Sequence, residues 1–317
     1  MRIIEAKQVF EKLTMSICLK IMEETLKDFS AGKSFQPLRN NVPLPHGNLL
    51  MLMPAYLGDD DYFGAKIISS FNSNAGSKYP THMGAIMLFD SKYGALRAIV
   101  EASAVTRIRT GAVSGVATKL LARADAHHLA IIGTGQQGRS HLEAITNVRE
   151  ITHVTVYDMN QESLENYVNE MSEKFGIAIK SCSTIKETVE NADIICCLTS
   201  SKEPYLELEW IKKGAHINAV GAFSKVTREV TSELVAKSCF YADSIESIMN
   251  ECGEFLIPKS EGLIDDSHII GEIGEVALKK VPGRQNEVDI TLFDALGLAV
   301  YDMACARYLY ELNPEAE

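Results

Sequence analysis

Three glycines near the middle of the chain have the spacing of a dinucleotide-binding turn. Gly133, Gly135 and Gly138 form the pattern G-x-G-x-x-G directly after the apolar run 129–132. The first glycine permits a tight turn, the second lets the backbone approach a pyrophosphate, and the third lets a helix pack close to the sheet. The N-terminus of that helix would present free N–H groups to the phosphates. This order predicts a dinucleotide site.

A carboxylate further along the chain indicates which dinucleotide is bound. Asp158 follows the apolar segment 153–157 and lies twenty positions after Gly138. A carboxylate in this place hydrogen-bonds the ribose 2′-hydroxyl of NAD and repels the 2′-phosphate of NADP. We therefore expect NAD(H) to be preferred, with NADP(H) as the alternative. A glycine turn in another kind of doubly wound domain is the competing interpretation, and the order of strand, glycines, helix and acid argues against it.

The composition excludes several classes of protein. The 317 residues are 46% apolar and 23% charged, as in ordinary globular proteins. A formal charge of −11 without any Lys/Arg-rich run argues against a nucleic-acid partner. The seven cysteines show no C-x-x-C spacing, so neither a disulfide framework nor a metal site is predicted. We expect a cytoplasmic protein with no membrane partner, because neither a signal-peptide pattern nor a long apolar stretch is present.

Two different patterns of predicted elements divide the chain. The first part has a helical pattern over 6–29, then strand-like runs without helices between them at 49–53, 62–70, 82–90 and 96–101. From about residue 112, helices alternate with strands at 129–132, 153–157, 177–181, 193–198, 216–220 and 239–242. We therefore predict an α/β protein in which an α+β domain with an antiparallel or mixed sheet precedes a Rossmann-type, doubly wound parallel sheet. A helix over 294–312 is expected to return to the first domain.

Several blocks of sequence resemble the ornithine cyclodeaminase/μ-crystallin family. They are Pro37-Leu-Arg39, Leu52-Met-Pro54, Gly64-Ala-Lys66, the run that starts at Arg109-Thr-Gly-Ala, the glycine turn, His216-Ile-Asn-Ala-Val-Gly221 and Thr291-Leu-Phe-Asp-Ala-Leu-Gly297. The resemblance implies a substrate-binding and dimerisation domain (1–115 plus 294–317), a Rossmann domain (116–293) and a homodimer. It also implies hydride transfer between a nicotinamide and the α-carbon of an amino or imino acid.

By this resemblance, three basic residues hold the substrate carboxylate. Arg39, Lys66 and Arg109 match the family's positions for this clamp, and Lys66 is the candidate catalytic residue. Arginine binds a planar carboxylate through two parallel hydrogen bonds, whereas lysine acts as a compact charge. Lys66 could instead be an outward-facing strand residue. Arg107, which could share a strand face with Arg109, is the competing arginine, and the family pattern favours Arg109.

The resemblance also assigns the cofactor contacts. Within the turn bounded by Gly133 and Gly138, Gly135, Gln136 and Gln137 would contact the pyrophosphate. Asp158 would contact the ribose. The remaining candidates are Thr81, Thr110, Thr199, Ser200, Val220 and Gly221. Thr199 and Ser200 follow a strand where Rossmann domains usually contact the nicotinamide ribose, but they could equally be turn residues. His82, a single histidine beside a strand, is interpreted as structural.

Two positions depart from the pattern of ornithine cyclodeaminases. Met51 stands where those enzymes carry a glutamate for the distal amino group, and Phe223 stands where they carry an aspartate for the reacting amine. A thioether and a phenyl ring cannot pair with an ammonium, so both are expected to form an apolar wall beside the substrate. The loss of both acids favours a cyclic imine over a diamine.

The sequence therefore predicts an NAD(P)H-dependent ketimine reductase. Its small-molecule substrate would be Δ1-pyrroline-2-carboxylate, Δ1-piperideine-2-carboxylate or both, and its products L-proline or L-pipecolate. Within the same family, an ornithine cyclodeaminase or an alanine dehydrogenase-type enzyme is the alternative. A μ-crystallin-like ligand-binding protein is an alternative of another class.

Overall fold

The computed structural model describes residues 1–58, 61–74 and 77–312, which form two compact units. Unit 1 comprises the described residues up to Arg109 and those from Gly297 onward, and unit 2 comprises Thr110–Leu296. The expected domain boundaries, 115/116 and 293/294, lie a few residues from these. Residues 313–317 of the expected first domain lie outside the described residues.

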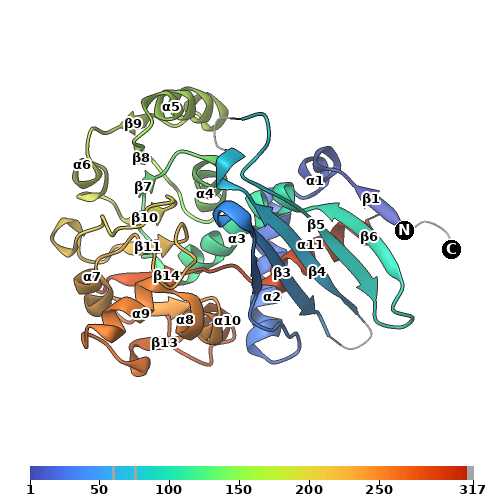
Figure 1. Ribbon diagram of the computed structural model, residues 1–317. Coiled ribbons are helices and arrows are strands. Elements are labelled where there is room, and N and C mark those ends of the chain that lie inside the picture. The colour runs from blue at the N-terminus through green and yellow to red at the C-terminus, as the bar shows by residue number, and fades with distance from the viewer. Residues whose placement is uncertain (59–60, 75–76, 313–317) are drawn as a thin grey trace. The chain divides into compact units, whose positions relative to one another are not determined.

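Unit 1 is built on a six-stranded mixed sheet (Figure 1). Its strands are β1 (Arg2–Ile4), β2 (Asn40–Pro43), β3 (Leu49–Tyr56), β4 (Tyr62–Ser70), β5 (His82–Asp90) and β6 (Leu96–Glu101), in the order β1-β6-β5-β4-β3-β2. All neighbouring pairs are antiparallel except β1 and β6. The mixed sheet and the strands 62–70, 82–90 and 96–101 confirm the prediction, whereas β1 and β2 were not predicted.

Three helical predictions at the ends of unit 1 need correction. The helix expected over 6–29 is two helices, α1 (Ala6–Lys12) and α2 (Met15–Ser30), because Thr14 is extended and serves as the N-cap of α2. The helix expected from 112 begins earlier, since α3 spans Ala102–Leu121. The helix expected over 294–312 is only α11 (Ala299–Glu311), which follows Gly297 with its positive φ of 83°. Such a φ interrupts a right-handed helix.

One face of the unit 1 sheet packs against helix α11, which in turn packs against α2. Met53, Lys66, Ile86 and Val100 lie in register across β3, β4, β5 and β6, and all four are buried. Because side chains alternate between the faces of a strand, this register puts Lys66 inside the unit, among apolar residues.

Unit 2 is an eight-stranded parallel sheet in the order β13-β12-β14-β11-β10-β7-β8-β9. Its strands are β7 (His128–Ile132), β8 (His153–Tyr157), β9 (Ile179–Ser181), β10 (Ile194–Cys197), β11 (His216–Ala219), β12 (Cys239–Ala242), β13 (Ile269–Glu272) and β14 (Thr291–Asp294). Its helices after α3 are α4 (Gln136–Thr146), α5 (Gln161–Phe175), α6 (Ile185–Val189), α7 (Ser232–Lys237), α8 (Ile245–Glu251), α9 (Gly253–Ser260) and α10 (Ile273–Ala277). The predicted doubly wound sheet is confirmed.

Alternate residues of the central strands supply two apolar cores on opposite faces of this sheet. Leu129 and Ile131 of β7 pack in one core with residues of α4 and α5. Ala130 and Ile132 pack in the other core with residues of α7, α8 and α9. Strands buried on both faces read as continuous apolar runs, and the sequence identified β7, β8, β10, β11 and β12, whereas β13 and β14 were not predicted.

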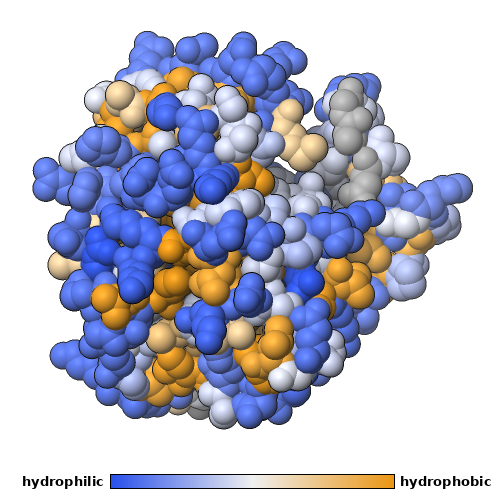
Figure 2. All heavy atoms as spheres, turned by 90° about the vertical axis from the view of Figure 1, so that its left-hand side faces the viewer, coloured by the Kyte–Doolittle hydropathy of each residue, from blue (hydrophilic) through white to orange (hydrophobic). Residues whose placement is uncertain are grey.

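No helix in the described residues is long and apolar enough to cross a membrane. Figure 2 shows a face of unit 2 on which hydrophilic side chains predominate, with separate apolar patches between them. Scattered apolar residues of this kind are normal on a protein surface.

Candidate active site

Lys66 is the most deeply buried cation of the predicted carboxylate clamp. Only 1% of its surface is exposed, although it lies in the middle of β4. The alternative prediction of an outward-facing lysine is therefore wrong. Its Nζ lies 2.7 Å from Oδ2 of Asp302 on α11, whose side chain is also fully buried.

Arg109 approaches the same carboxylate from another element. It lies on α3, and its Nε donates to Oδ1 of Asp302 at 3.2 Å. The interpretation that Arg107 and Arg109 share a face of a strand is wrong, because both lie on this helix. The guanidinium of Arg107 instead lies over the ring of Phe10, 5.4 Å from its centroid. The neighbours thus face different surroundings, and Arg109 is the one next to Lys66.

Arg39 completes the group of cations. It lies just before β2, and its Nη2 donates to the carbonyl of Gly297 at 3.4 Å. A Cβ on Gly297 would lie 3.1 Å from Nη1 of Arg109, so the two guanidinium groups approach the same turn before α11. Three cations therefore converge within unit 1.

Asp302 is a site residue that the sequence interpretation missed. It is the single acid in the apolar stretch of α11 between Ala299 and Ala306, and it is completely buried. A lone acid within a buried apolar stretch usually has a charged partner, and this signal could have singled it out. Lys66 and Arg109 thus share the one carboxylate of Asp302.

Burial and charge together shift the acid–base behaviour of Lys66. Burial lowers its pKa to about 8, with the cations Arg109 and Arg39 acting in the same direction, while Asp302 opposes the shift. The pKa of Lys66 thereby comes close to neutral pH. The side chain can then bind an anion in its protonated form and can also give up a proton.

The predicted apolar residue Met51 lies beside this group. It is buried in β3, two residues from Met53, the cross-strand partner of Lys66. Since residues two apart share a face of a strand, Met51 and Lys66 lie on the same side of the sheet. Met51 thus puts an apolar side chain on the face that carries Lys66, and its contact with the substrate remains a prediction.

The glycine turn in unit 2 has the geometry that its sequence predicts. Gly133 follows β7 with φ of 100°, and a Cβ there would lie 2.7 Å from the carbonyl oxygen of Leu198. A Cβ on Gly138 would lie 2.6 Å from the carbonyl of Gly133, so the close approach of helix α4 requires glycine. Gly135 is the N-cap of α4 and has open space where a side chain would be.

Asp158 lies at the end of β8, next to this turn. Its Oδ2 accepts from the backbone N–H of Thr134 at 2.7 Å and from the Thr134 hydroxyl at 2.8 Å, and its Oδ1 accepts from the N–H of Asn160. These bonds fix the carboxylate beside the glycines. Gln136 and Gln137 open α4, and Oε1 of Gln137 is buried without a hydrogen-bond partner.

This arrangement fits the predicted dinucleotide. The N-terminus of α4 offers N–H groups that have no partner within the helix, and Gly135 leaves room for a pyrophosphate to lie close to the backbone. Asp158 supplies a fixed hydrogen-bond acceptor. The turn also follows β7, which neighbours β10 where the strand order reverses, and open α/β sheets bind their ligands at this point.

The other candidates lie at strand ends. Thr199 and Ser200 follow β10, and Val220 and Gly221 follow β11; a Cβ on Gly221 would lie 2.1 Å from the Thr199 carbonyl oxygen. The structure thus brings the residues after β7, β10 and β11 together at one edge of unit 2. Phe223 lies in the next loop, 45% exposed.

Two threonines lie apart from these strand ends. Thr110, on α3, is the first residue of unit 2. Thr81 precedes β5 in unit 1, and its hydroxyl lies 3.1 Å from Nδ1 of His82. His82 in turn lies 3.2 Å from the hydroxyl of Ser70, in keeping with a structural role. The cofactor contacts of both threonines remain predictions.

A buried cluster in unit 2 has the residue types of a metal site. Cys252, Glu254 and Asp294 place ligand atoms within 4.8 Å of one another. Burial raises the pKa of all three groups, which favours their protonated forms. Because metals bind deprotonated ligands, this arrangement does not fit a metal well. The absence of a metal site remains a prediction.

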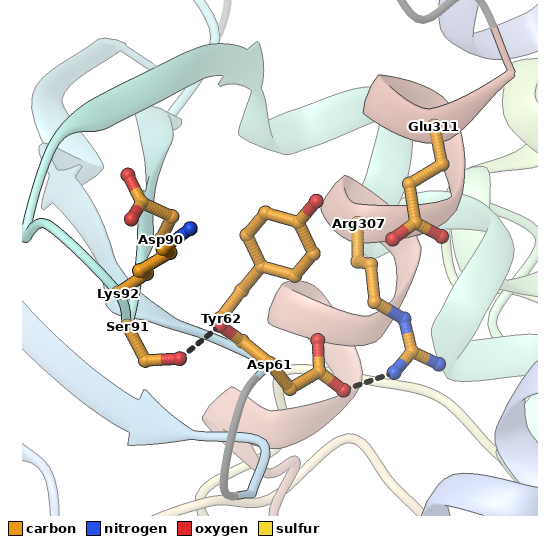
Figure 3. A pocket seen from close by; sticks show the side chains of 7 residues that line it. All are labelled: Asp61, Tyr62, Asp90, Ser91, Lys92, Arg307 and Glu311. Atoms are coloured by element: carbon orange, nitrogen blue, oxygen red, sulfur yellow. Dashed lines mark hydrogen bonds and ion pairs between the residues drawn. The ribbon is translucent and has the colours of Figure 1, made fainter.

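A separate surface pocket of about 430 Å³ lies in unit 1 (Figure 3). Its lining residues are Asp61, Tyr62, Asp90, Ser91, Lys92, Arg307 and Glu311. Arg307 pairs with Asp61, and Asp90 accepts from Arg97 and from the backbone of its own turn. Asp61, Asp90 and Arg307 thus already have charged partners, and the lining includes no member of the clamp.

The fold and the two sets of residues define a class of protein: one unit is a Rossmann-type domain with the glycine turn of dinucleotide-binding proteins, and the other holds a buried group of cations. The sequence model of the ornithine cyclodeaminase/mu-crystallin family matches residues 2–316. The chain belongs to this family.

Relatives within the family narrow the comparison. The chain is 36% identical to Delta(1)-pyrroline-2-carboxylate reductase of Bacillus cereus, over 98% of this chain and 96% of that protein. It is 33% identical to ketimine reductase mu-crystallin of Mus musculus, over 97% and 96%. The structure of Thermococcus litoralis Delta(1)-pyrroline-2-carboxylate reductase in complex with NADH and L-proline is similar with a TM-score of 0.95 and 37% identity, covering 98% and 97%.

Proposed function

We propose that this protein is an NADH-dependent ketimine reductase that converts Δ1-pyrroline-2-carboxylate, Δ1-piperideine-2-carboxylate or both into L-proline or L-pipecolate. The observation that carries the proposal is the pairing of Lys66 and Arg109 with the buried carboxylate of Asp302, with Arg39 bound nearby to the carbonyl of Gly297. The carboxylate of a cyclic imine is an anion that this group of cations would bind. The identity to pyrroline-2-carboxylate and ketimine reductases over nearly the whole chain supports it.

The chain's own residues would act on the substrate as follows. Arg39 and Arg109 bind and orient the carboxylate, as guanidinium groups suit its planar shape. Lys66 adds a charge and, with a pKa of about 8, can protonate the imine nitrogen. A protonated imine accepts hydride more readily at C2, and NADH supplies that hydride when bound. Asp302 keeps Lys66 and Arg109 in place.

The apolar wall argues for an imine rather than a diamine. Met51 offers no charge to a distal ammonium, and the clamp cations next to it would repel one. We infer that a neutral ring lies against Met51.

We propose NADH as the preferred cofactor. Asp158 carries a fixed negative charge beside the glycine turn, where it would accept from the ribose 2′-hydroxyl and repel a 2′-phosphate.

The proposed activity is tested with purified protein, both cyclic imines, and NADH or NADPH. We expect oxidation of NADH with at least one imine and formation of the matching cyclic amino acid. No oxidation of either cofactor with either imine would refute the proposal. Alanine or ornithine with NAD⁺, followed as NADH, ammonia and proline, tests the dehydrogenase and cyclodeaminase alternatives. Stoichiometric ligand binding without turnover would favour a binding protein.

We also propose that the protein is a homodimer that pairs through the outer face of the unit 1 sheet. Pro54, Ala65, Met87 and Ile99 lie in register across this face and are only half-buried. The rings of Phe63 and Phe89 stack on the same face, with centroids 5.4 Å apart. Apolar faces of this extent usually mark an interface.

A second copy of the chain suits this face, because a two-fold dimer buries the same surface of both subunits. Sedimentation velocity should show a dimer, and Met87→Glu should dissociate it, whereas Lys92→Glu, at an exposed lysine, should not. A monomeric native protein at micromolar concentration would refute the pairing.

A further inference from the structure

Glu229 binds two of the segments that follow the strands at the carboxyl end of the unit 2 sheet. Its Oε1 accepts from the backbone N–H of Thr199 at 2.7 Å and from the Thr199 hydroxyl at 2.8 Å. Its Oε2 accepts from the backbone N–H of Gly221 at 2.8 Å. One side chain thus binds the residues that follow β10 and β11.

The two segments that Glu229 holds are packed backbone against backbone. A Cβ on Gly221 would lie 2.1 Å from the Thr199 carbonyl and 2.6 Å from Oε2 of Glu229. A Cβ on Gly133 would lie 2.7 Å from the Leu198 carbonyl. The glycine turn, the end of β10 and the end of β11 therefore form one continuous surface, and a shift of either held segment would change its shape.

The hydrogen-bond pattern suits an ionised carboxylate. Tyr205 adds a fourth donor, its hydroxyl, to Oε1 at 2.7 Å. All four partners can donate, and two of them are backbone N–H groups that can only donate. Burial raises the pKa of Glu229, and these hydrogen bonds oppose that shift.

Glu229 is itself fixed from behind. It is completely buried, and its backbone N–H donates to Oε1 of Glu254 at 2.7 Å. The backbone of Tyr205 donates to the Glu229 carbonyl at 2.9 Å. The carboxylate is thus held in one place, so the distance between the segments that it binds is fixed before any ligand arrives.

We propose that Glu229 is a positioning residue for the nicotinamide half of the cofactor, acting through the backbones of Thr199 and Gly221. The glycine turn, with Asp158, serves the pyrophosphate and the adenosine half. The ends of β10 and β11, on the other side of the point where the strand order reverses, are left for the nicotinamide and its ribose. This inference rests on the proposed binding of NADH, but not on the identity of the imine.

The test compares two ligands that share only one half. ADP carries the adenosine and pyrophosphate without nicotinamide, whereas NADH carries both halves. In Glu229→Gln an amide NH₂ group must replace one oxygen, so one donor faces another donor. We expect the Kd of NADH, from its fluorescence, to rise at least tenfold, since a hydrogen bond to a charged group is lost. The Kd of ADP, from displacement of NADH, should stay within about twofold.

Two further variants make the result interpretable. Glu233→Gln removes an exposed acid of α7 and should leave both Kd values unchanged. Glu229→Asp keeps the charge but is one methylene shorter. It should therefore raise the Kd of NADH less than Glu229→Gln does and again leave the Kd of ADP unchanged. If Glu229→Gln does not fold, Glu229→Asp carries the same comparison.

The inference is wrong if NADH binds the Glu229 variants with the native Kd. It is also wrong if the Kd values of NADH and ADP rise by the same factor, since an equal loss would indicate a structural role alone. Selective loss of NADH binding in the Glu229 variants, together with no turnover of either imine by the native protein, would support the inference while refuting the proposed reaction. The two proposals can therefore fail independently.

Discussion

Lys66→Met gives the most direct test of the clamp. Methionine has nearly the length of lysine and suits the apolar face of β4, so the substitution removes the charge while keeping the packing volume. Asp302 retains its bond to Arg109 at 3.2 Å and is not left as an isolated buried charge. The change should therefore act mainly on the substrate.

The magnitude follows from the burial of Lys66. Removing one partner of a buried charge pair costs about 2–5 kcal/mol, which corresponds to a decrease in kcat/KM of about 30- to 5,000-fold. The binding of NADH should change little, because the glycine turn and Asp158 belong to unit 2. The decreases in kcat/KM in Arg39→Met and Arg109→Met should be less than additive with that in Lys66→Met, since on this proposal all three cations bind the same substrate carboxylate.

The assay measures kcat/KM with the preferred imine, the Kd of NADH and the thermal midpoint. Lys20→Met, at an exposed lysine of α2, is the matched control and should behave as the native protein. Near-normal turnover in folded Lys66→Met would refute the clamp. A parallel loss of NADH binding would show that the damage is not confined to the substrate.

Four further predictions follow from the same contacts. Because the pKa of Lys66 is lowered to about 8, kcat/KM should fall as the pH rises through about 8 and the cation is lost; Lys66→Arg should move this alkaline limb upward. Asp302→Asn removes the group that raises the pKa of Lys66, so the alkaline limb should move below pH 8, and the loss of a buried partner should destabilise folding by about 3–5 kcal/mol in denaturant titrations. Asp158→Ser should lower the ratio of kcat/KM for NADH to that for NADPH at least tenfold; a native preference for NADPH would contradict the cofactor assignment. Gly133→Ala should abolish measurable NADH binding, because φ of 100° and a carbonyl oxygen 2.7 Å from the new methyl leave no room for it, and unchanged affinity would contradict the geometry of the turn.

The sequence by itself determined the elements whose signals are local. Strands β7 and β10 of unit 2 read as apolar runs because both of their faces are buried, whereas β13 and β14 were not predicted. The glycine turn could be recognised because its positive φ and close approaches restrict the residue type. Asp158 could be assigned from the sequence because it lies twenty positions after Gly138, at the spacing expected for the ribose-binding acid. The family resemblance pointed to Lys66 where local pattern alone favoured a solvent-facing lysine.

Only the tertiary structure decided which charges meet. Lys66, Arg109 and Asp302 come from β4, α3 and α11, and Asp302 lies 193 positions after Arg109. No period or spacing in the sequence encodes such a contact, so Asp302 was missed and Arg107 could not be separated from Arg109 by pattern. Glu229 was missed for the same reason: its partners Thr199 and Gly221 are brought to it by the order of strands in the sheet. Local propensity determines the elements, whereas the pairing of buried charges depends on long-range packing that removes them from water.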